Sequence, residues 1–143
     1  MITLLIEPGQ PPQLVNVSWE EIRRILGWLE IIHPFEDPNV VLIDDEDGIR
    51  NERLPNRTIN GCIIPGPFFI CRFDAAEEFV DLTPADIKLY SDMFSVPEHF
   101  AKDGQWRITS YTEEIPEKHL NIFHMESAWV PSATSTTGKE TSS

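Results

Sequence analysis

Short apolar runs separated by Pro and Gly dominate the first two thirds of the chain. Residues 2–6 (ITLLI) and 13–17 (QLVNV) predict two strands, and the turn EPGQPP between them predicts a β-hairpin. Residues 28–35 (WLEIIHPF) predict a third strand, which ends at a proline.

The middle of the chain alternates turn signals with further strands. Residues 39–43 (NVVLI) are β-branched and apolar, which is typical of a central strand. The Asp-Gly pair at 47–48 is a hairpin signal, so residues 49–54 are expected to return antiparallel to that strand. Two more apolar runs, 62–64 and 68–73, are interrupted by the sequence Pro-Gly-Pro.

A first helix is predicted to begin after Ser18. Glu21 lies three residues further on, which is the spacing of a capping box. Apolar residues then follow at helical intervals and form one stripe: Trp19, Ile22, Ile25, Leu26 and Leu29. Gly27 is expected to end this helix, although the periodicity alone also allows it to continue to Ile31.

A second helix is predicted after Thr83. Pro84 suits the first helical position, and Asp86 completes a capping box. Ile87, Tyr90 and Phe94 form its apolar stripe, and the helix should end near Ser95.

These elements predict an α+β fold with a mainly antiparallel sheet of five or six strands and two packed helices, in the order ββαβββα. Phe68 and Phe69 are consecutive on a strand and must face opposite sides, which favours a sheet covered on both faces. The expected core comprises Leu4, Ile6, Val15, Ile22, Leu26, Val41, Ile43, Ile64, Ile70, Ile87 and Tyr90.

The pattern divides the chain into three parts. Residues 1–96 are expected to form the core domain, and residues 97–131 an extension docked on it. Within the extension, residues 105–111 predict an edge strand and residues 116–129 a short helix. Residues 132–143 are rich in Ser and Thr and are expected to be disordered.

Three stretches occur in an order that resembles one protein family. They are LLIEPGQPP at the start, LPNRTINGCIIPGPFFI in the middle and FVDLTPADIKLYSDMF after it. The chain resembles the DUF3846 family of small bacterial and phage-borne domains over residues 1–96. The resemblance implies a setting on phages or other mobile elements, and it brings no activity or catalytic residues.

The charge balance restricts the partners. The chain has 24 acidic and 11 basic residues, a formal charge of −13. This charge disfavours direct binding of nucleic acid or an anionic membrane and leaves room for a basic protein partner. The N-terminal residues lack the features of a secretory signal, so a cytoplasmic protein with reduced thiols is expected, in the bacterial host if the gene is phage-borne. The sequence leaves open whether the protein forms a homo-oligomer.

The sequence predicts neither a metal site nor a cofactor nor catalytic residues. The acidic run 44–47 before Gly48 resembles a calcium loop, but Ile43 falls on the first ligand position, so a solvated turn is expected. His119 and His124 are five residues apart, which is not the spacing of a helical zinc pair.

Cys62 and Cys71 have two interpretations. A tight reversal at the Pro-Gly-Pro sequence would place them opposite each other on paired strands, whereas a chain that runs straight through would separate them. In either case we expect buried structural thiols rather than a nucleophile.

Positive charge is concentrated in one window of this acidic chain. Four arginines lie there, and the polar loop between them adds amide, hydroxyl and glycine positions suited to an anion. The candidate ligand-binding residues are Arg50, Arg53, Asn56, Arg57, Thr58, Asn60, Gly61 and Arg72. The alternative is that these arginines pair with the acids at 44–47, or with Glu52 and Asp74.

Three functions are therefore considered. The first is a non-enzymatic binding protein of a phage or mobile element that neutralises a host factor, such as an anti-defence protein that sequesters a small phosphorylated or nucleotide signal. The second is an acidic protein–protein inhibitor that presents its surface in place of DNA. The third is a nucleotide hydrolase, for which the sequence offers no convincing metal cluster or nucleophile.

Overall fold

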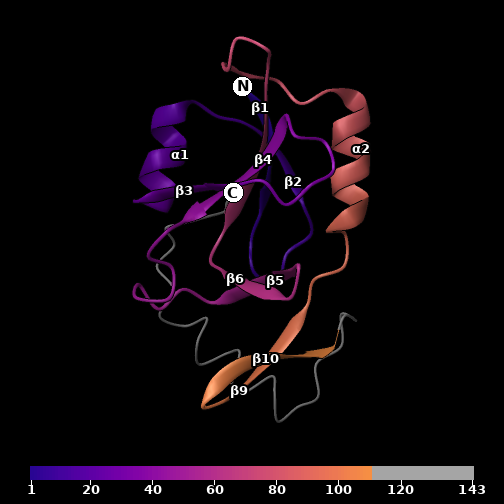
Figure 1. Cartoon of the computed structure of the whole chain (residues 1–143). Helices are drawn as coiled ribbons and strands as arrows, with labels where there is room; N and C mark the ends of the chain where they lie inside the picture. The colour runs from indigo at the N-terminus through magenta and orange to yellow at the C-terminus, as the bar shows by residue number, and fades with distance from the viewer. Residues whose placement is uncertain (111–143) are drawn as a thin grey trace.

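A computed structural model describes residues 1–110 of the chain (Figure 1). Its main sheet is antiparallel throughout, with the strand order β2-β1-β7-β4-β3 and with β8 paired to β7. The strands of this sheet are β1 (Ile2–Ile6), β2 (Gln13–Asn16), β3 (Leu29–Ile32), β4 (Val40–Asp45), β7 (Phe68–Phe73) and β8 (Phe79–Val80). The hairpin predicted from residues 2–6 and 13–17 is confirmed.

Both helices begin at the predicted caps. In α1 (Trp19–Leu26), the Ser18 hydroxyl accepts the Glu21 N–H at 3.1 Å, and the Glu21 carboxylate accepts the Ser18 N–H at 2.8 Å. Gly27 ends this helix with a φ of 82°, a conformation that glycine adopts without strain. The helix therefore stops before Trp28, and the alternative that it continues to Ile31 is wrong.

The second helix, α2 (Pro84–Met93), has the same type of cap. The Thr83 hydroxyl accepts the Asp86 N–H at 3.1 Å, and Asp86 accepts the Thr83 N–H at 2.9 Å. The helix ends at Met93, slightly earlier than the sequence predicted.

The two helices cover opposite faces of the main sheet (Figure 1). Phe68 packs with Tyr90 and Phe94 on the α2 face, whereas Phe69 packs with α1 residues on the other face. Both phenylalanines are fully buried, so the predicted two-sided cover is confirmed. Side chains alternate between the two faces of a strand, so neighbouring residues along β1, β4 and β7 belong in turn to the core on the α2 face and to the core on the α1 face.

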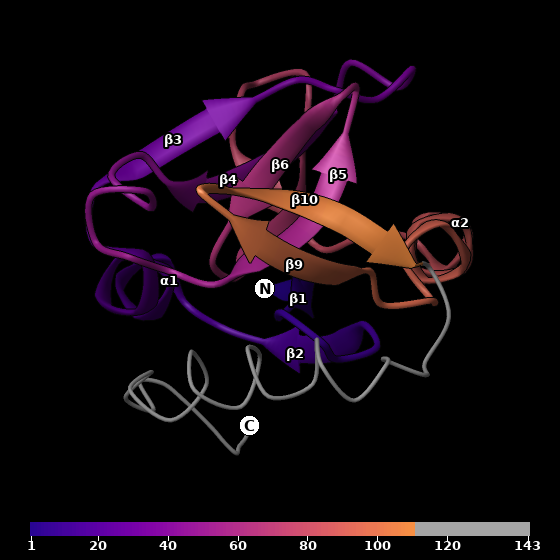
Figure 2. The same ribbon diagram turned by 90° about the horizontal axis from the view of Figure 1, so that it is seen from below.

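Two small hairpins complete the described part. They are the pair β5 (Pro55–Ile59) and β6 (Cys62–Pro65) and the pair β9 (His99–Asp103) and β10 (Gln105–Ser110). The β9–β10 hairpin lies beside the β5–β6 hairpin at one end of the molecule (Figures 1 and 2). Residues 105–110 of the predicted edge strand are therefore a strand, whereas the predicted helix 116–129 and tail 132–143 lie outside the described residues.

The α+β class and the antiparallel sheet agree with the sequence, but the element order does not. Six strands rather than three lie between the two helices. Residues 49–54 do not form the predicted partner of β4, whose neighbours are β3 and β7. Instead, residues 46–52 fold as consecutive turns, and at their start the Asp45 carboxylate accepts the Asp47 N–H at 2.9 Å.

The expected core is buried except at two positions. Val15 and Ile87 are only half-buried, although both pack against the core. Val15 lies on β2, which is an edge strand with a neighbour on one side only. No helix of the described residues is long and apolar enough to cross a membrane.

Candidate functional site

Arg57, the centre of the predicted ligand site, lies inside the protein with 1% of its surface exposed. Its Nη2 donates to the backbone carbonyls of Gln10 at 2.6 Å and Phe94 at 2.9 Å, and Nη1 donates to Asn56 Oδ1 at 2.9 Å. Burial lowers the pKa of Arg57 to about 10, so the group is still charged at neutral pH. The guanidinium therefore serves as an internal cross-link rather than a surface anion receptor.

Asn56 and Thr58 are also bound by the protein itself. Asn56 is the extra residue of a β-bulge, and its Nδ2 donates to the carbonyls of Ile6 and Gly66, both at 2.8 Å. The Thr58 N–H donates to the Glu98 carboxylate at 2.9 Å. These bonds connect β5 with β1, with the chain before β7 and with the segment before β9.

Asn60 and Gly61 form the two-residue turn between β5 and β6. Their φ angles are 52° and 84°, the positive pair that a type I′ hairpin turn requires. The geometry of the hairpin turn thus explains why Asn and Gly occupy these two positions.

Arg53 joins the acidic segment to the end of α1. Its Nε donates to Asp45 Oδ2 at 2.9 Å, and its Nη2 donates to the carbonyls of Ile25 at 3.1 Å and Leu26 at 3.4 Å. The last carbonyls of a helix lack partners within the helix, so this side chain satisfies two of them.

Arg72 is held by two carboxylates on the α2 face. Nε and Nη2 donate to the two oxygens of Asp86 at 2.6 and 2.8 Å, and Nη2 also donates to Asp37 Oδ2 at 2.5 Å. These hydrogen bonds raise the pKa of Arg72 and lower that of Asp86. Its partners are not the acid expected from sequence, Asp74.

Arg50 remains at the surface, with 82% of its side chain exposed, and pairs with Asp47 at 3.5 Å. The four arginines have different partners, and their guanidinium groups do not gather at one surface: Arg50, Arg53, Arg57 and Arg72. Pairing with the acidic run, the alternative interpretation, is present at two of the four positions. Binding of an anion by this cluster stays a prediction.

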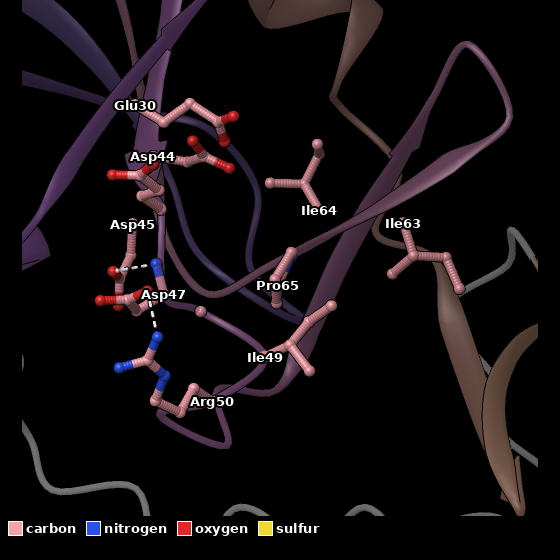
Figure 3. A pocket seen from close by; sticks show the side chains of 11 residues that line it. Glu30, Asp44, Asp45, Asp47, Ile49, Arg50, Ile63, Ile64 and Pro65 are labelled. Carbon is pink, nitrogen blue, oxygen red and sulfur yellow. Dashed lines mark hydrogen bonds and ion pairs between the residues drawn. The ribbon is translucent and has the colours of Figure 1, made fainter.

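The acidic side chains, in contrast, line a surface pocket of about 460 Å³, here called the acidic pocket (Figure 3). It lies where β3 begins and β4 ends, and it is bounded by the loop after β4 and by strand β6. Its acidic wall comprises Glu30, Asp44, Asp45, Glu46 and Asp47, and its apolar wall comprises Ile63, Ile64 and Pro65.

Glu30 and Asp44 form a pair of carboxyl groups in this pocket. They are direct partners in the β3–β4 register, so their side chains share one face of the sheet, and Figure 3 shows them side by side. Asp44 is 3% exposed, and its buried Oδ1 accepts no hydrogen bond from a neighbouring donor. Burial, the charge of Glu30 and a hydrogen bond with Glu30 raise the pKa of Asp44 to about 7. The pair thus holds a proton close to neutral pH.

The next residue along β4 has the opposite environment. Asp45 points to the other face of the sheet and accepts from the Asp47 N–H, Asn51 Nδ2 and Arg53 Nε, each at 2.9 Å. Three donors thus satisfy this buried carboxylate, whereas the group that faces Asp44 across the strands is another carboxyl group, that of Glu30.

The loop after β4 fits closely against β6. A Cβ atom added at Gly48 would lie 2.7 Å from Pro65 Cγ, so only glycine permits this approach. Ile49 follows directly and is 84% exposed at the rim of the acidic pocket.

A second pocket of about 590 Å³ lies between this loop and the β9–β10 hairpin. Its lining includes Ile49, Arg53, Ile63, Lys102 and Trp106. Lys102 Nζ lies 5.3 Å from the centre of the Trp106 ring, a cation–π contact.

The two cysteines lie in different sheets. Cys62 is exposed on β6, which pairs with β5, whereas Cys71 is buried on β7, which pairs with β1, β4 and β8. The interpretation that places them opposite each other is therefore wrong, and the expected burial is confirmed for Cys71 but wrong for Cys62, which lies on a two-stranded hairpin. Burial raises the pKa of Cys71 to about 12, which leaves this thiol unreactive at neutral pH. Within residues 1–110, no group of three or more His, Cys, Asp or Glu side chains is placed to hold a metal ion.

A family model described as a domain of unknown function, DUF3846, matches residues 1–95. The chain belongs to the DUF3846 family. No curated protein and no solved structure matches it. Every residue of the acidic pocket lies within the DUF3846 match, whereas the second pocket also uses Lys102 and Trp106 beyond it. The acidic pocket is thus a feature of the DUF3846 domain itself.

The sequence contained only half of the signal for the acidic pocket in this DUF3846 domain. The acidic run 44–47 was visible, but it was interpreted as a solvated turn. Glu30 lies on another strand, and only the β3–β4 register brings it to Asp44. A strand alignment that paired residues 29–32 with 42–45 would have found the pair.

Proposed function

We propose that this DUF3846 domain is a non-enzymatic binding protein that takes a basic group of a protein partner into its acidic pocket. One observation carries the proposal: Asp44 is a buried carboxyl group in a surface pocket, and its Oδ1 accepts from no donor of the described residues. The three arginines Arg53, Arg57 and Arg72, by comparison, are already held by internal acceptors. A basic ligand would therefore meet acceptors here, whereas an anion would compete with bonds within the fold.

Exposed apolar side chains beside the acids support a protein as the partner. Ile49 lies at the rim, and Trp28 is 73% exposed directly before β3. The Trp28 carbonyl accepts the N–H of Glu46, a pocket residue, at 2.8 Å, so this tryptophan lies beside the acidic wall. Protein interfaces commonly combine an aromatic anchor with a charged pocket.

The family resemblance supplies the biological setting of the proposal. A protein of a phage or mobile element would act in the bacterial cytoplasm and neutralise a host factor, for example as an anti-defence protein. The formal charge of −13 suits a host protein with a basic, DNA-binding face.

The nucleotide-sequestering version has one supporting observation, the second pocket. Trp106 with Lys102 beside its ring, near Arg53, is an arrangement that suits a planar anionic ligand. A thermal-shift panel of nucleotides and cyclic nucleotides tests this version, and the absence of any shift eliminates it.

The main proposal is tested with two matched peptides, (Gly-Arg)₄ and (Gly-Glu)₄, titrated against the full chain at low and high salt. We expect the basic peptide alone to bind, with affinity that falls as salt rises. Glu46→Gln removes one exposed charge at the pocket, and Glu36→Gln removes one on the loop between β3 and β4. The first should weaken binding about two- to fivefold, corresponding to ~0.5–1 kcal/mol, and the second much less. Equal effects of the two variants, or preferential binding of (Gly-Glu)₄, would rule out the acidic pocket as the docking site.

A further inference from the structure

The Glu30–Asp44 pair is short of one positive charge. Two carboxyl groups in contact cannot both be ionised at low cost, so a proton or a cation must lie between or beside them. No lysine or arginine of the described residues forms an ion pair with either group, and Asp44 Oδ1 is buried without a donor. The nearest cation in the pocket lining, Arg50, is paired with Asp47 instead.

We infer that the Glu30–Asp44 pair is the receptor for one cationic side chain of the partner, a guanidinium or a primary ammonium, which replaces the proton that the pair holds when the pocket is empty. This inference rests on the proposed function and assigns the atoms that would carry it. The ligand donates N–H groups to the carboxyl oxygens, and the displaced proton leaves to solvent.

The opposite wall of the acidic pocket favours an organic cation over a metal ion. Ile63, Ile64 and Pro65 face the carboxyl pair across the pocket (Figure 3) and offer apolar surface, not ligand oxygens. The aliphatic stem of an arginine or lysine can lie against such a wall while its charged head reaches the acids. No metal-holding group of three or more side chains is present among the described residues.

The charged groups around the pair make the exchange selective for a cation. On β4 and the loop after it, Glu46 adds negative charge, Asp47 is paired with Arg50, and Asp45 is neutralised by Arg53 on the other face of the sheet. The β6 wall contributes no ionisable group to the lining. A ligand with a single positive charge is thus attracted by the rim and neutralised by the pair.

Proton exchange predicts a definite pH dependence. At the pKa of Asp44, about 7, half of the empty sites hold the proton, so the apparent affinity for the cation is half of its high-pH limit. Below this pKa, each pH unit should cost close to tenfold in affinity, and above it affinity should level off. Between pH 8 and pH 6 we expect a loss of about tenfold, with uptake of the cation accompanied by release of up to about one proton per site.

The test is an NMR titration of the full chain with methylguanidinium and with methylammonium, at pH 6 and pH 8. Methylurea has the shape of methylguanidinium without its charge and serves as the neutral control. The readouts are the backbone amide shifts of Glu30 and Asp45 and the carboxyl ¹³C shift of Asp44. We expect saturable shifts with the two cations only, about tenfold tighter at pH 8, and a lowered pKa for Asp44 at saturation.

Two variants distinguish a loss of binding at the pair from a loss of the native fold. Asp44→Asn and Glu30→Gln should each abolish the saturable shifts while the remaining amide spectrum stays native, and Glu36→Gln should bind like the wild type. Binding unaffected by Asp44→Asn, affinity that is equal at both pH values, or displacement of methylguanidinium by millimolar Mg²⁺ or Ca²⁺ would overturn the inference.

The peptide titration separates this inference from the proposed function. Binding of (Gly-Arg)₄ that is unchanged in Asp44→Asn would leave the docking proposal intact and refute the role of the pair. Binding of methylguanidinium at the pair without any binding of (Gly-Arg)₄ would refute the docking proposal and leave the receptor assignment intact.

Discussion

Glu30 and Asp44 face each other across strands β3 and β4, and the partner that each carboxyl group meets is another carboxyl group. A sheet places directly opposed side chains in contact, and like charges in such positions destabilise it. The fold therefore retains a local conflict in a region that is otherwise well packed. Such conflicts are expected where a protein must bind something, since the ligand can remove them.

Replacement of Asp44 should reveal the cost of this pair. The pKa of Asp44 is raised from 3.8 to about 7, so the unfolded chain loses its proton at lower pH than the folded protein does. Well below pH 3.8 the carboxyl group is protonated in both states, and as pH rises to about 7 the folded state loses ~2–4 kcal/mol relative to the unfolded state. In Asp44→Asn the amide cannot ionise and can donate a hydrogen bond to Glu30. We expect this variant to be more stable than the wild type at pH 8, with the advantage gone near pH 4.

Urea denaturation from pH 4 to pH 8 measures this difference directly. Glu36→Gln, a change of one exposed acid outside the pocket, should give a curve parallel to the wild type. A constant offset between Asp44→Asn and the wild type over the whole range would show that Asp44 ionises normally.

Arg57 should behave as a structural residue. Arg57→Ala leaves the carbonyls of Gln10 and Phe94 and the Asn56 side chain without their donor inside the protein. Loss of such a buried network typically costs about 3–5 kcal/mol. Arg50→Ala, at an exposed position with one 3.5 Å ion pair, should change the free energy of unfolding by less than ~0.5 kcal/mol. Equal stabilities of the two variants in urea denaturation would contradict this assignment.

The contrast between Arg57 and Arg50 shows which features of the structure the sequence could predict and which it could not. Capping boxes and alternating apolar strands are local signals, so both helices, the β1–β2 hairpin and the two-sided core were predicted correctly. Burial of a charged side chain is not local. Arg57 and Arg50 have the same side chain in neighbouring segments, and only the tertiary contacts decide that one is inside and the other outside.

The hairpin error has a different cause. Two dipeptides, Asp47-Gly48 and Asn60-Gly61, carry the same turn signal, and the first was chosen. The structure uses the second, because residues 55–59 and 62–65 can pair on both sides of it. After Asp47-Gly48 the chain turns again within a few residues, since the Arg53 N–H donates to the Gly48 carbonyl at 3.0 Å.

The two cysteines should differ in reactivity. Cys62 is exposed on β6, whereas Cys71 is fully buried and its pKa is raised to about 12 by burial. Thiolate is the reactive form, so a disulfide reagent such as DTNB should modify Cys62 rapidly in the native protein and Cys71 only after denaturation. Cys62→Ser should then show almost no native reaction. Rapid modification of both thiols in the native wild type would indicate that β7 opens readily.

Arg72 and Asp86 should give a pH dependence of the opposite sign to that of Asp44. The bidentate hydrogen bonds from Arg72 lower the pKa of Asp86 below its usual 3.8, and the capping bonds at Thr83 act in the same direction. An acid with a lowered pKa stabilises the folded state above its unfolded pKa, and this stability is lost as pH falls through the folded value.

Arg72→Met removes the guanidinium and should cost about 2 kcal/mol at pH 7, because Asp86 and Asp37 lose a common, largely buried partner. At pH 2.5, below the ordinary pKa of 3.8, these carboxyl groups are protonated in the unfolded chain and part of the stability from the pair is already lost, so the cost of Arg72→Met should be clearly smaller than at pH 7. Lys88→Met, which breaks the exposed pair with Asp92, is the control and should change stability little at either pH. Urea unfolding at the two pH values, followed by far-UV circular dichroism, measures the cost of both variants. A cost for Arg72→Met that does not depend on pH would mean that the packing of the side chain, and not its charge, stabilises α2 against β7.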